Sequence, residues 1–242
     1  MTPELIGILA GMGPRSTAPF VDLLIGKCVE LYGAKYDDDF PPLMIYSLPT
    51  PFFVERGMNH ENAKATIVEG LRKLQDCGAA LMAMPCNSAH VYFDELSVSV
   101  EVPLLNMVNE TVVSLHDTSR RVGLLGAEMT VSSGMYQRQL LDRGFEVVRE
   151  GRWQPQLNEL IVAIKSFAPR RELERRWEDI KRVLKHQDVD TFIVACTDLN
   201  ALELASGRGI TIVDAGECLA QATVRRWRDI VGSTSPSADG SA

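Results

Sequence analysis

Two copies of one sequence pattern make up most of this chain, and each copy contains a cysteine at the same place. The apolar segment LIGILAG opens the first copy and RVGLLGA opens the second. Cys86 lies 78 residues after Ile8, and Cys196 lies 72 residues after Leu124. A short helical stretch and another apolar segment then follow each cysteine. The repeat predicts two similar domains with matching cysteines.

Short apolar segments alternate with amphipathic stretches along the chain. Apolar residues three or four positions apart, as in the stretch from Leu157 to Ile164, predict helices. Strands that alternate with helices form parallel sheets with crossover connections. We therefore expect an α/β fold of two domains, each a mostly parallel sheet flanked by helices, related by a pseudo-twofold axis with the active site in the cleft between them. The expected strands are Leu5–Ala10, Leu43–Leu48, Ala79–Met84, Pro103–Asn106, Arg121–Leu125, Phe145–Val148, Thr191–Ala195 and Ile210–Val213.

The domain prediction divides the chain near residues 116–120. Residues 1–117 form the first α/β domain and residues 118–213 form the second. A last helix over 214–231 is expected to pack back on the first domain. Residues 232–242 are mostly Ser, Gly, Pro and Ala, a composition that predicts a disordered tail.

Charge and composition argue against several classes of protein. The chain has 25 Lys and Arg against 32 Asp and Glu, a formal net charge of −7, whereas nucleic-acid binding favours clustered basic residues. It contains no continuous apolar run long enough to span a membrane. Five cysteines without a recognisable export signal indicate reduced thiols in the cytoplasm. Cys86-x3-His90 alone is a weak match to metal-ligand spacing, so we expect no metal.

The paired cysteines indicate proton transfer. Ligands bind beyond the carboxyl ends of parallel strands, where Cys86 and Cys196 both lie. Each also precedes a helix, whose N-terminus is expected to lower the thiol pKa. Thiols on opposite sides of a small molecule would suit removal of a proton from one face and delivery to the other, which inverts a stereocentre. The unpaired Cys28, Cys77 and Cys218 are interpreted as ordinary core or surface thiols.

A glycine turn follows the first strand. Gly11, Met12 and Gly13 precede a helix that starts at Pro14. A dinucleotide site would need glycine where Ser16 stands, so we expect neither NAD nor ATP. The backbone N–H groups of this turn and helix are instead expected to hold a carboxylate of the substrate.

Polar residues near the turn and the cysteines are the other candidates for substrate binding. Asn87 and Thr197 directly follow the cysteines and are expected to bind the α-carboxylate of the substrate. Ser88 is a weaker candidate for the same role. His90 is expected either to polarise the Cys86 thiol or to be a buried structural histidine. Substrate contact and helix capping are the two alternatives for Ser16, Thr17, Thr130 and Ser132.

Four motifs in this chain are also found together in one known family. They are GILAGMGPRST (Gly7–Thr17), MPCNSAH (Met84–His90), TVSSGMY (Thr130–Tyr136) and ACTDL (Ala195–Leu199). With them, the chain from about Leu5 to Val231 resembles the aspartate/glutamate racemase superfamily, most closely its aspartate racemase branch. The family pattern has Gly where Ala10 and Ala195 stand, and Glu where Asp198 stands.

The resemblance implies a cofactor-independent racemase, often a dimer, that inverts Cα of a small amino acid, with aspartate or glutamate expected first. It implies that Cys86 and Cys196 are the catalytic acid and base. Lys165 matches a lysine that the family uses near the substrate. Asp198 is expected to tune Cys196 or to contact the substrate.

A second basic residue of the aspartate racemases is expected shortly after the second strand. The segment there is SLPTPFFVERG, in which Phe53 or Val54 stands at the equivalent position and Arg56 lies close by. Arg56 is therefore a candidate for this role, and a less acidic or bulkier substrate side chain is an open alternative.

Other functions remain open at this point. A maleate isomerase-like enzyme would use one cysteine as a nucleophile, and a hydantoin racemase-like enzyme would use the two-base design on a ring. A catalytically silent amino-acid-binding protein is the alternative outside enzymes. The expected partners are a small amino acid and a second copy of the chain, without nucleic acid or membrane.

Overall fold

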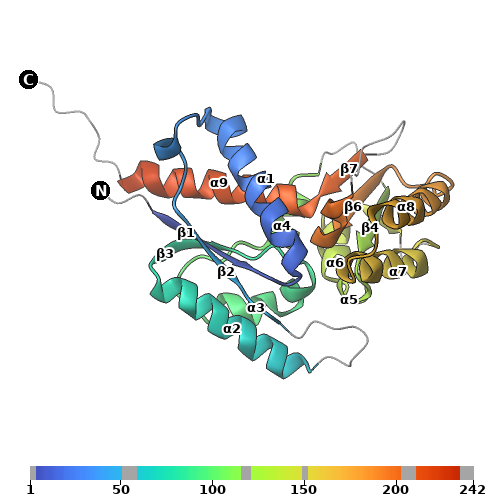
Figure 1. The fold of residues 1–242 in the computed structure, drawn as a ribbon, viewed down its shortest axis with the longest axis horizontal. Coiled ribbons are helices and arrows are strands. Elements are labelled where there is room, and N and C mark those ends of the chain that lie inside the picture. The colour runs from blue at the N-terminus through green and yellow to red at the C-terminus, as the bar shows by residue number, and fades with distance from the viewer. Residues whose placement is uncertain (1–3, 51–58, 116–120, 149–151, 203–210, 235–242) are drawn as a thin grey trace, which may run out of the picture.

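The protein contains two parallel sheets, each flanked by helices (Figure 1). The computed structural model describes residues 4–50, 59–115, 121–148, 152–202 and 211–234. All strand pairs named within them are parallel, which confirms the expected α/β fold. The first sheet contains β1 (Leu5–Ala10), β2 (Leu43–Ser47) and β3 (Ala79–Ala83), and the second contains β4 (Arg121–Gly126), β5 (Glu146–Val148), β6 (Thr191–Ala195) and β7 (Thr211–Asp214).

The strand order shows the repeat directly. The first sheet has the order β2-β1-β3 and the second has the order β5-β4-β6-β7. In each sheet the first strand of the repeat lies between the second and the third. Strands β3 and β6 are therefore equivalent, and the two cysteines follow these two strands.

The strand expected over Pro103–Asn106 is reduced to one bridge between Leu104 and Met82. Pro103 has no N–H to donate, which limits pairing on that side. Asn106 is already the N-cap of the next helix, where its side chain accepts hydrogen bonds from two backbone N–H groups. The segment that would form the fourth strand of the first sheet is consequently too short to be a strand.

Residues of β1 alternate between two cores. On one face, Ile6 and Ile8 pack with Phe20 of the helix that follows β1. On the other face, Leu9 packs with Ile67, as the two-residue period of a strand requires. Helices α2 and α3 cover one face of this sheet, and α1, α4 and α9 cover the other (Figure 1). These helices are α1 (Thr17–Tyr32), α2 (His60–Asp76), α3 (Phe93–Ser97), α4 (Met107–Val113) and α9 (Ala215–Thr234).

Helix α9 follows the second sheet in sequence but packs on the first. Its residue Leu219 is fully buried in the core that contains Ile6 and Ile8. Lys27 of α1 pairs with Glu217 at 2.6 Å, and the Trp227 indole donates to the carbonyl of Glu4. The chain therefore crosses twice between the two sheets.

Helix α9 is longer than expected. It continues to Thr234, so residues 232–234 are helical and the prediction that the tail begins at residue 232 is wrong. The Ser233 hydroxyl donates to the carbonyl of Ile230, which satisfies a carbonyl in the last turn. Residues 235–242 lie outside the described part of the chain.

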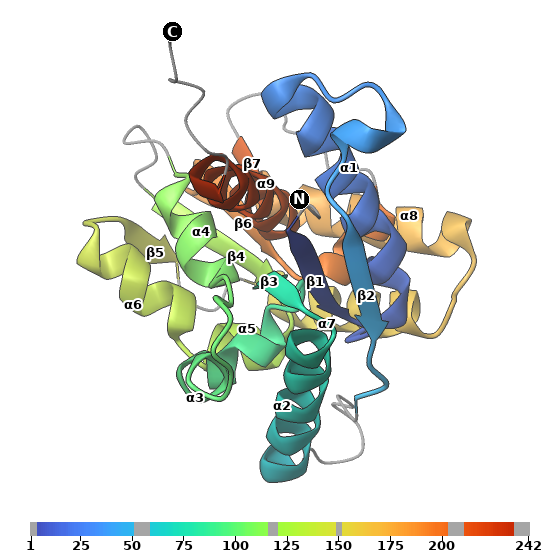
Figure 2. The same cartoon turned by 90° about the vertical axis from the view of Figure 1, so that its left-hand side faces the viewer.

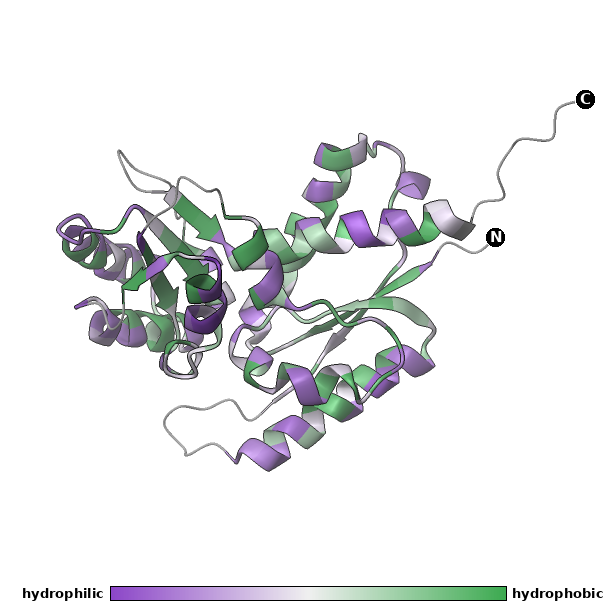
Figure 3. Cartoon of the chain, turned by 180° about the vertical axis from the view of Figure 1, so that it is seen from behind, coloured by the Kyte–Doolittle hydropathy of each residue, from purple (hydrophilic) through white to green (hydrophobic). Residues whose placement is uncertain are grey.

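The second sheet is covered by α5 (Glu128–Ser132), α6 (Met135–Asp142), α7 (Gln154–Lys165) and α8 (Arg170–Leu184). Leu157, Leu160, Ile161 and Ile164 of α7 are buried, as their spacing predicts. The strands are hydrophobic and the outer faces of the helices are hydrophilic (Figure 3). Within the described residues, no helix is long and apolar enough to cross a membrane.

Candidate active site

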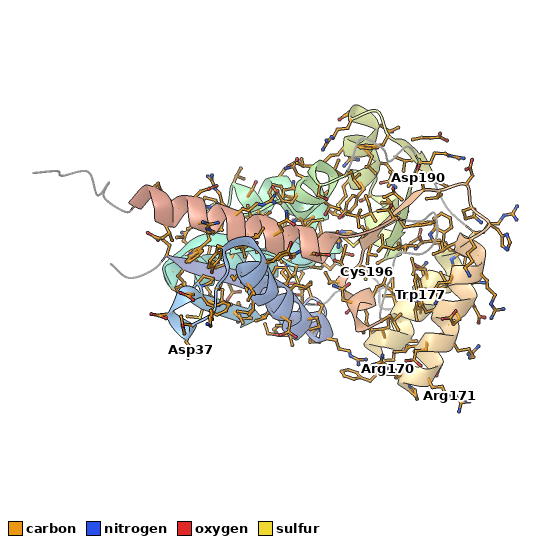
Figure 4. The ribbon with its side chains drawn as sticks, turned by 90° about the horizontal axis from the view of Figure 1, so that it is seen from above. Asp37, Arg170, Arg171, Trp177, Asp190 and Cys196 are labelled. Carbon is orange, nitrogen blue, oxygen red and sulfur yellow. The ribbon has the colours of Figure 1, made fainter. Side chains whose placement is uncertain are left out.

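The two cysteines occupy matching positions after equivalent strands. Cys86 lies three residues beyond the end of β3, and Cys196 directly follows β6. Each comes just before a five-residue 3-10 helix, η4 (Ser88–Tyr92) or η5 (Thr197–Ala201). Both side chains are buried. Figure 4 places Cys196 where the two halves of the molecule meet.

The prediction that the helix N-termini lower the pKa of the two thiols is wrong. Burial raises the pKa of Cys86 to about 11 and that of Cys196 to about 12. Backbone N–H groups of Ala89 and Ser88 act in the opposite direction on Cys86, with a smaller effect. Because each helix has only five residues, few aligned peptide dipoles oppose the cost of burial. Both thiols are therefore protonated at neutral pH.

An ion pair lies beside Cys196. Lys165 Nζ, at the end of α7, lies 2.7 Å from Oδ2 of Asp198 in η5. Burial lowers the pKa of Lys165, but the Asp198 carboxylate more than offsets this effect and the pKa is raised. The side chain of Asp198 is 5% exposed and that of Lys165 is 41% exposed, so the lysine is the more accessible member of the pair.

The ion pair influences both thiols. Asp198 raises the pKa of Cys86 and of Cys196, and Lys165 lowers both. The Cys196 thiol also donates to Asp198 Oδ2 over 3.9 Å. The four side chains thus form one electrostatic group, to which both halves of the repeat contribute.

The glycine turn after β1 closes on this ion pair. A Cβ atom on Gly13 would lie 3.1 Å from Asp198 Oδ1 and 3.2 Å from Lys165 Nζ. Gly11 has φ +90°, and a Cβ there would lie 2.5 Å from the backbone N of Leu48. Glycine is therefore required at position 11 by its backbone conformation, whereas a side chain at position 13 would press on the ion pair.

The loop that contains Cys86 is bonded to the second half of the protein at three points. These bonds connect three residues of the loop to η5, α6 and α5. They run from Thr197 Oγ1 to Pro85 O (3.1 Å), from Tyr136 Oη to Asn87 Oδ1 (2.5 Å), and between Ser88 Oγ and Thr130 Oγ1 (3.0 Å).

Two polar atoms near the cysteine loop and the turn are buried without a hydrogen-bond partner among the described residues. They are Asn87 Nδ2 and Thr17 Oγ1. Buried polar groups are nearly always paired, so an unpaired one calls for an explanation, and a catalytic role is one such explanation. Substrate contact is the prediction for Asn87 and one of the two alternatives for Thr17, and each residue leaves a polar atom unpaired among the described residues.

His90 has no ring nitrogen left for the thiol. Its Nδ1 lies 2.9 Å from the carbonyl oxygen of Cys86, and its Nε2 accepts from the N–H of Met107 at 3.0 Å. Nδ1 therefore has the proton and donates to the Cys86 carbonyl. Burial lowers the pKa of His90, so the ring is neutral and holds the backbone of the cysteine loop.

The remaining candidates lie in different surroundings. Met12 is buried in the same cluster as Cys86, and the Ser16 hydroxyl donates to the carbonyl of Gly13. Thr130 is buried and Ser132 is exposed. Both lie inside α5, whose N-cap is Ala127, so capping at the start of α5 is wrong for either. Phe53, Val54 and Arg56 lie outside the described residues.

Sequence reasoning missed the hydroxyl of Tyr136, although the residue is part of the TVSSGMY motif. Its position at the start of α6, in the second copy of the repeat, was the available signal. The described residues contain no group of three or more His, Cys, Asp or Glu side chains placed to hold a metal ion.

The opposing effects of Asp198 and Lys165 give a testable pH dependence. Asp198→Asn removes a negative charge beside Cys196, so we expect its thiol to ionise at lower pH. Lys165→Met removes a positive charge, so we expect ionisation at higher pH. Mass spectrometry of iodoacetamide labelling at Cys196 across a pH series measures both shifts, with Glu174→Gln on the surface of α8 as control. Unchanged or reversed shifts would contradict this electrostatic assignment.

The sequence matches the Asp/Glu/Hydantoin racemase family over residues 9–223. The broad specificity amino-acid racemase RacX of Bacillus subtilis (strain 168) is 42% identical over 92% of this chain and 98% of its own length. The structure resembles aspartate racemase from Picrophilus torridus with a TM-score of 0.78 and 27% identity, over 93% of this chain and 94% of that one. It also resembles an aspartate racemase homologue from Pyrococcus horikoshii OT3 with a TM-score of 0.74 and 25% identity, over 94% and 100% of the two chains. The match to the family extends over most of the chain, and the protein therefore belongs to the Asp/Glu/Hydantoin racemase family.

Proposed function

We propose that this protein is a cofactor-independent amino-acid racemase in which Cys86 and Cys196 act on opposite faces of Cα. The observation that supports it most is the burial of both thiols after equivalent strands, beside one shared ion pair. One thiolate takes the Cα proton and becomes a thiol. The other thiol gives its proton to the opposite face and becomes a thiolate. The proton count is unchanged, and the electron pair stays on the carbanion between the two transfers.

The raised thiol pKa is compatible with this chemistry once a substrate is bound. The α-ammonium group of an amino acid brings a positive charge next to the thiols, which favours the thiolate form. A thiolate whose conjugate acid has a high pKa is also a stronger base toward the weakly acidic Cα–H. Burial thus strengthens the base. The positive charge of the substrate stabilises the thiolate, and the thiol proton is released to solvent as that thiolate forms.

We assign the α-carboxylate to the polar groups around the cysteine loop and the turn. Asn87 Nδ2 and Thr17 Oγ1 have no hydrogen-bond partner in the part of the chain that the structure describes, and the Gly11–Gly13 turn contributes backbone N–H groups. The Thr197 hydroxyl already donates to Pro85, so we expect its contribution to come from the backbone N–H. Ser88 and Thr130 share one hydrogen bond, which leaves one hydroxyl proton of the pair available. Ser132 and Met12 complete the proposed substrate-binding set.

Lys165 is our candidate for recognition of the substrate side chain. Aspartate and glutamate are the first substrates to test, because the ammonium group of this partly exposed side chain can donate to a second carboxylate. Asp198 neutralises part of this charge, which would moderate the preference for acidic side chains. Maleate and hydantoins are the substrates to test if amino acids fail.

We also retain three proposals that concern the protein as a whole. The domains divide near residues 116–120, with α9 belonging to the first. The protein acts in the cytoplasm, a location that suits its five free cysteines.

The third of these proposals is that the protein forms a homodimer through β2. This strand is the outer strand of its sheet (Figure 2), and its residues Met44 and Ile45 are exposed.

The cysteine mechanism predicts the fate of the Cα proton. In D2O, the wild-type protein should exchange the Cα proton of both enantiomers of its substrate. Cys86→Ala and Cys196→Ala should each reduce inversion by at least about 10²-fold, because each removes one of two acid–base groups. NMR of a panel of L- and D-amino acids measures the exchange. Cys77→Ala, which changes an exposed thiol, is the control. Full inversion by either active-site variant would exclude the two-base mechanism.

The side-chain assignment predicts a selective effect of Lys165→Met. Loss of a charged hydrogen bond should raise KM for aspartate by about tenfold or more, with a much smaller change for alanine. Initial rates with both amino acids measure the difference, and Lys185→Met at the end of α8 is the control. Equal losses for aspartate and alanine would show that Lys165 does not recognise the side chain.

The dimer proposal predicts a molar mass near twice 26.8 kDa by sedimentation equilibrium. Met44→Glu on β2 should shift the protein toward the monomer, since it adds charge to the apolar edge. Val98→Glu changes a residue that is 83% exposed at the end of α3 and should leave the mass unchanged. A monomeric wild-type protein would refute the proposal.

A further inference from the structure

The Asn87 side chain is not used in the way its position suggests. Asn87 is the N-cap of η4, where asparagine commonly accepts a hydrogen bond from the backbone. Here it makes no side-chain cap bond. Its Oδ1 instead accepts from Tyr136 Oη at 2.5 Å, across the boundary between the two halves of the repeat.

Tyr136 is held firmly enough to orient this amide. Its side chain is fully buried in a core cluster that includes Leu124, Leu140 and Val108. Burial raises the pKa of Tyr136, so the hydroxyl keeps its proton over the whole working range of pH. A phenol has one proton to donate, and here it is directed at Asn87 Oδ1.

This bond determines which end of the amide is free. Since Oδ1 accepts from Tyr136, the amino group Nδ2 is the end that stays unpaired. It is buried without a partner in the described residues, one residue after Cys86. A buried donor left unpaired destabilises the folded protein, and a carboxylate placed there would remove that cost.

We propose that Tyr136 is a positioning residue that fixes the Asn87 amide with its amino group toward the α-carboxylate of the substrate. The inference rests on the racemase function proposed above. Without the tyrosine hydroxyl the amide could reverse, and its oxygen would then face the carboxylate. Tyr136 therefore acts on affinity for the carboxylate, through Asn87, and touches neither Cα nor a thiol.

The test compares ligands that have an α-carboxylate with ligands that lack its charge. Titration calorimetry measures binding of L-aspartate and its α-amide, and of L-lysine and L-lysinamide, so that both acidic and basic side chains are covered. Tyr136→Phe should weaken binding of the amino acid by about two- to tenfold, the range for one hydrogen bond. It should leave the affinity for the α-amide unchanged.

A double-mutant cycle isolates the route through Asn87. In an Asn87→Ala background, Tyr136→Phe should have no further effect on amino-acid binding. Tyr32→Phe is the matched control, because it removes a hydroxyl that donates to the Asp39 carbonyl in the first domain. If Tyr136→Phe does not fold, Asn87→Asp provides a second test: it keeps the acceptor for Tyr136 and should weaken carboxylate binding by about tenfold or more through repulsion.

The outcomes separate this inference from the function on which it rests. A wild-type protein that binds neither amino acid would overturn the proposed function together with this inference. Normal wild-type binding with no change in Tyr136→Phe, an equal loss for the α-amide, or a loss that persists with Asn87→Ala would overturn the role of Tyr136 alone. Unweakened amino-acid binding by Asn87→Asp would do the same.

Discussion

Parallel pairing fixes where chemistry can occur in this protein. All strands of a parallel sheet end at one edge, so residues that follow β3 and β6 lie at the carboxyl edges of the two sheets. Helix α9 then returns to the first core, and Lys27 joins it to α1. With the two sheets held by this crossing, the loops after β3 and β6 meet. The contacts between Pro85 and Thr197 and between Gly13 and Asp198 are consequences of that arrangement.

Burial outweighs local electrostatics at both thiols. Removal from water raises the pKa of Cys86 and Cys196 more than backbone N–H groups or Lys165 lower it. Asp198 raises the pKa of both thiols further, so both are neutral at neutral pH. At neutral pH, therefore, either thiolate forms to a large extent only beside an added positive charge. In the mechanism proposed above, the α-ammonium group of the substrate would supply that charge, while the neutral thiols would resist reactions that require a thiolate.

The sequence was sufficient for the repeat and for most strands, because both depend on short-range apolar patterns. Strands β1 and β6 begin and end where the pattern predicts. It failed at Pro103, where one missing N–H and the cap at Asn106 shorten a strand to a bridge. It failed also for the thiol pKa, because burial depends on how two distant segments pack. The Tyr136–Asn87 bond spans 49 residues, and local patterns contain no information about such a contact.

The two cysteines are equivalent in the repeat but not in their surroundings. The loop around Cys86 is held by neutral hydrogen bonds with Tyr136 and Thr130, whereas Cys196 lies against the Lys165–Asp198 ion pair. The two enantiomers of an amino acid have equal free energy, so racemisation has an equilibrium constant of unity and kcat/KM must be the same in both directions. The asymmetry of the site can therefore appear only as compensating differences in kcat and KM. Differences in the ground-state binding of the two enantiomers would raise both constants in one direction and lower both in the other.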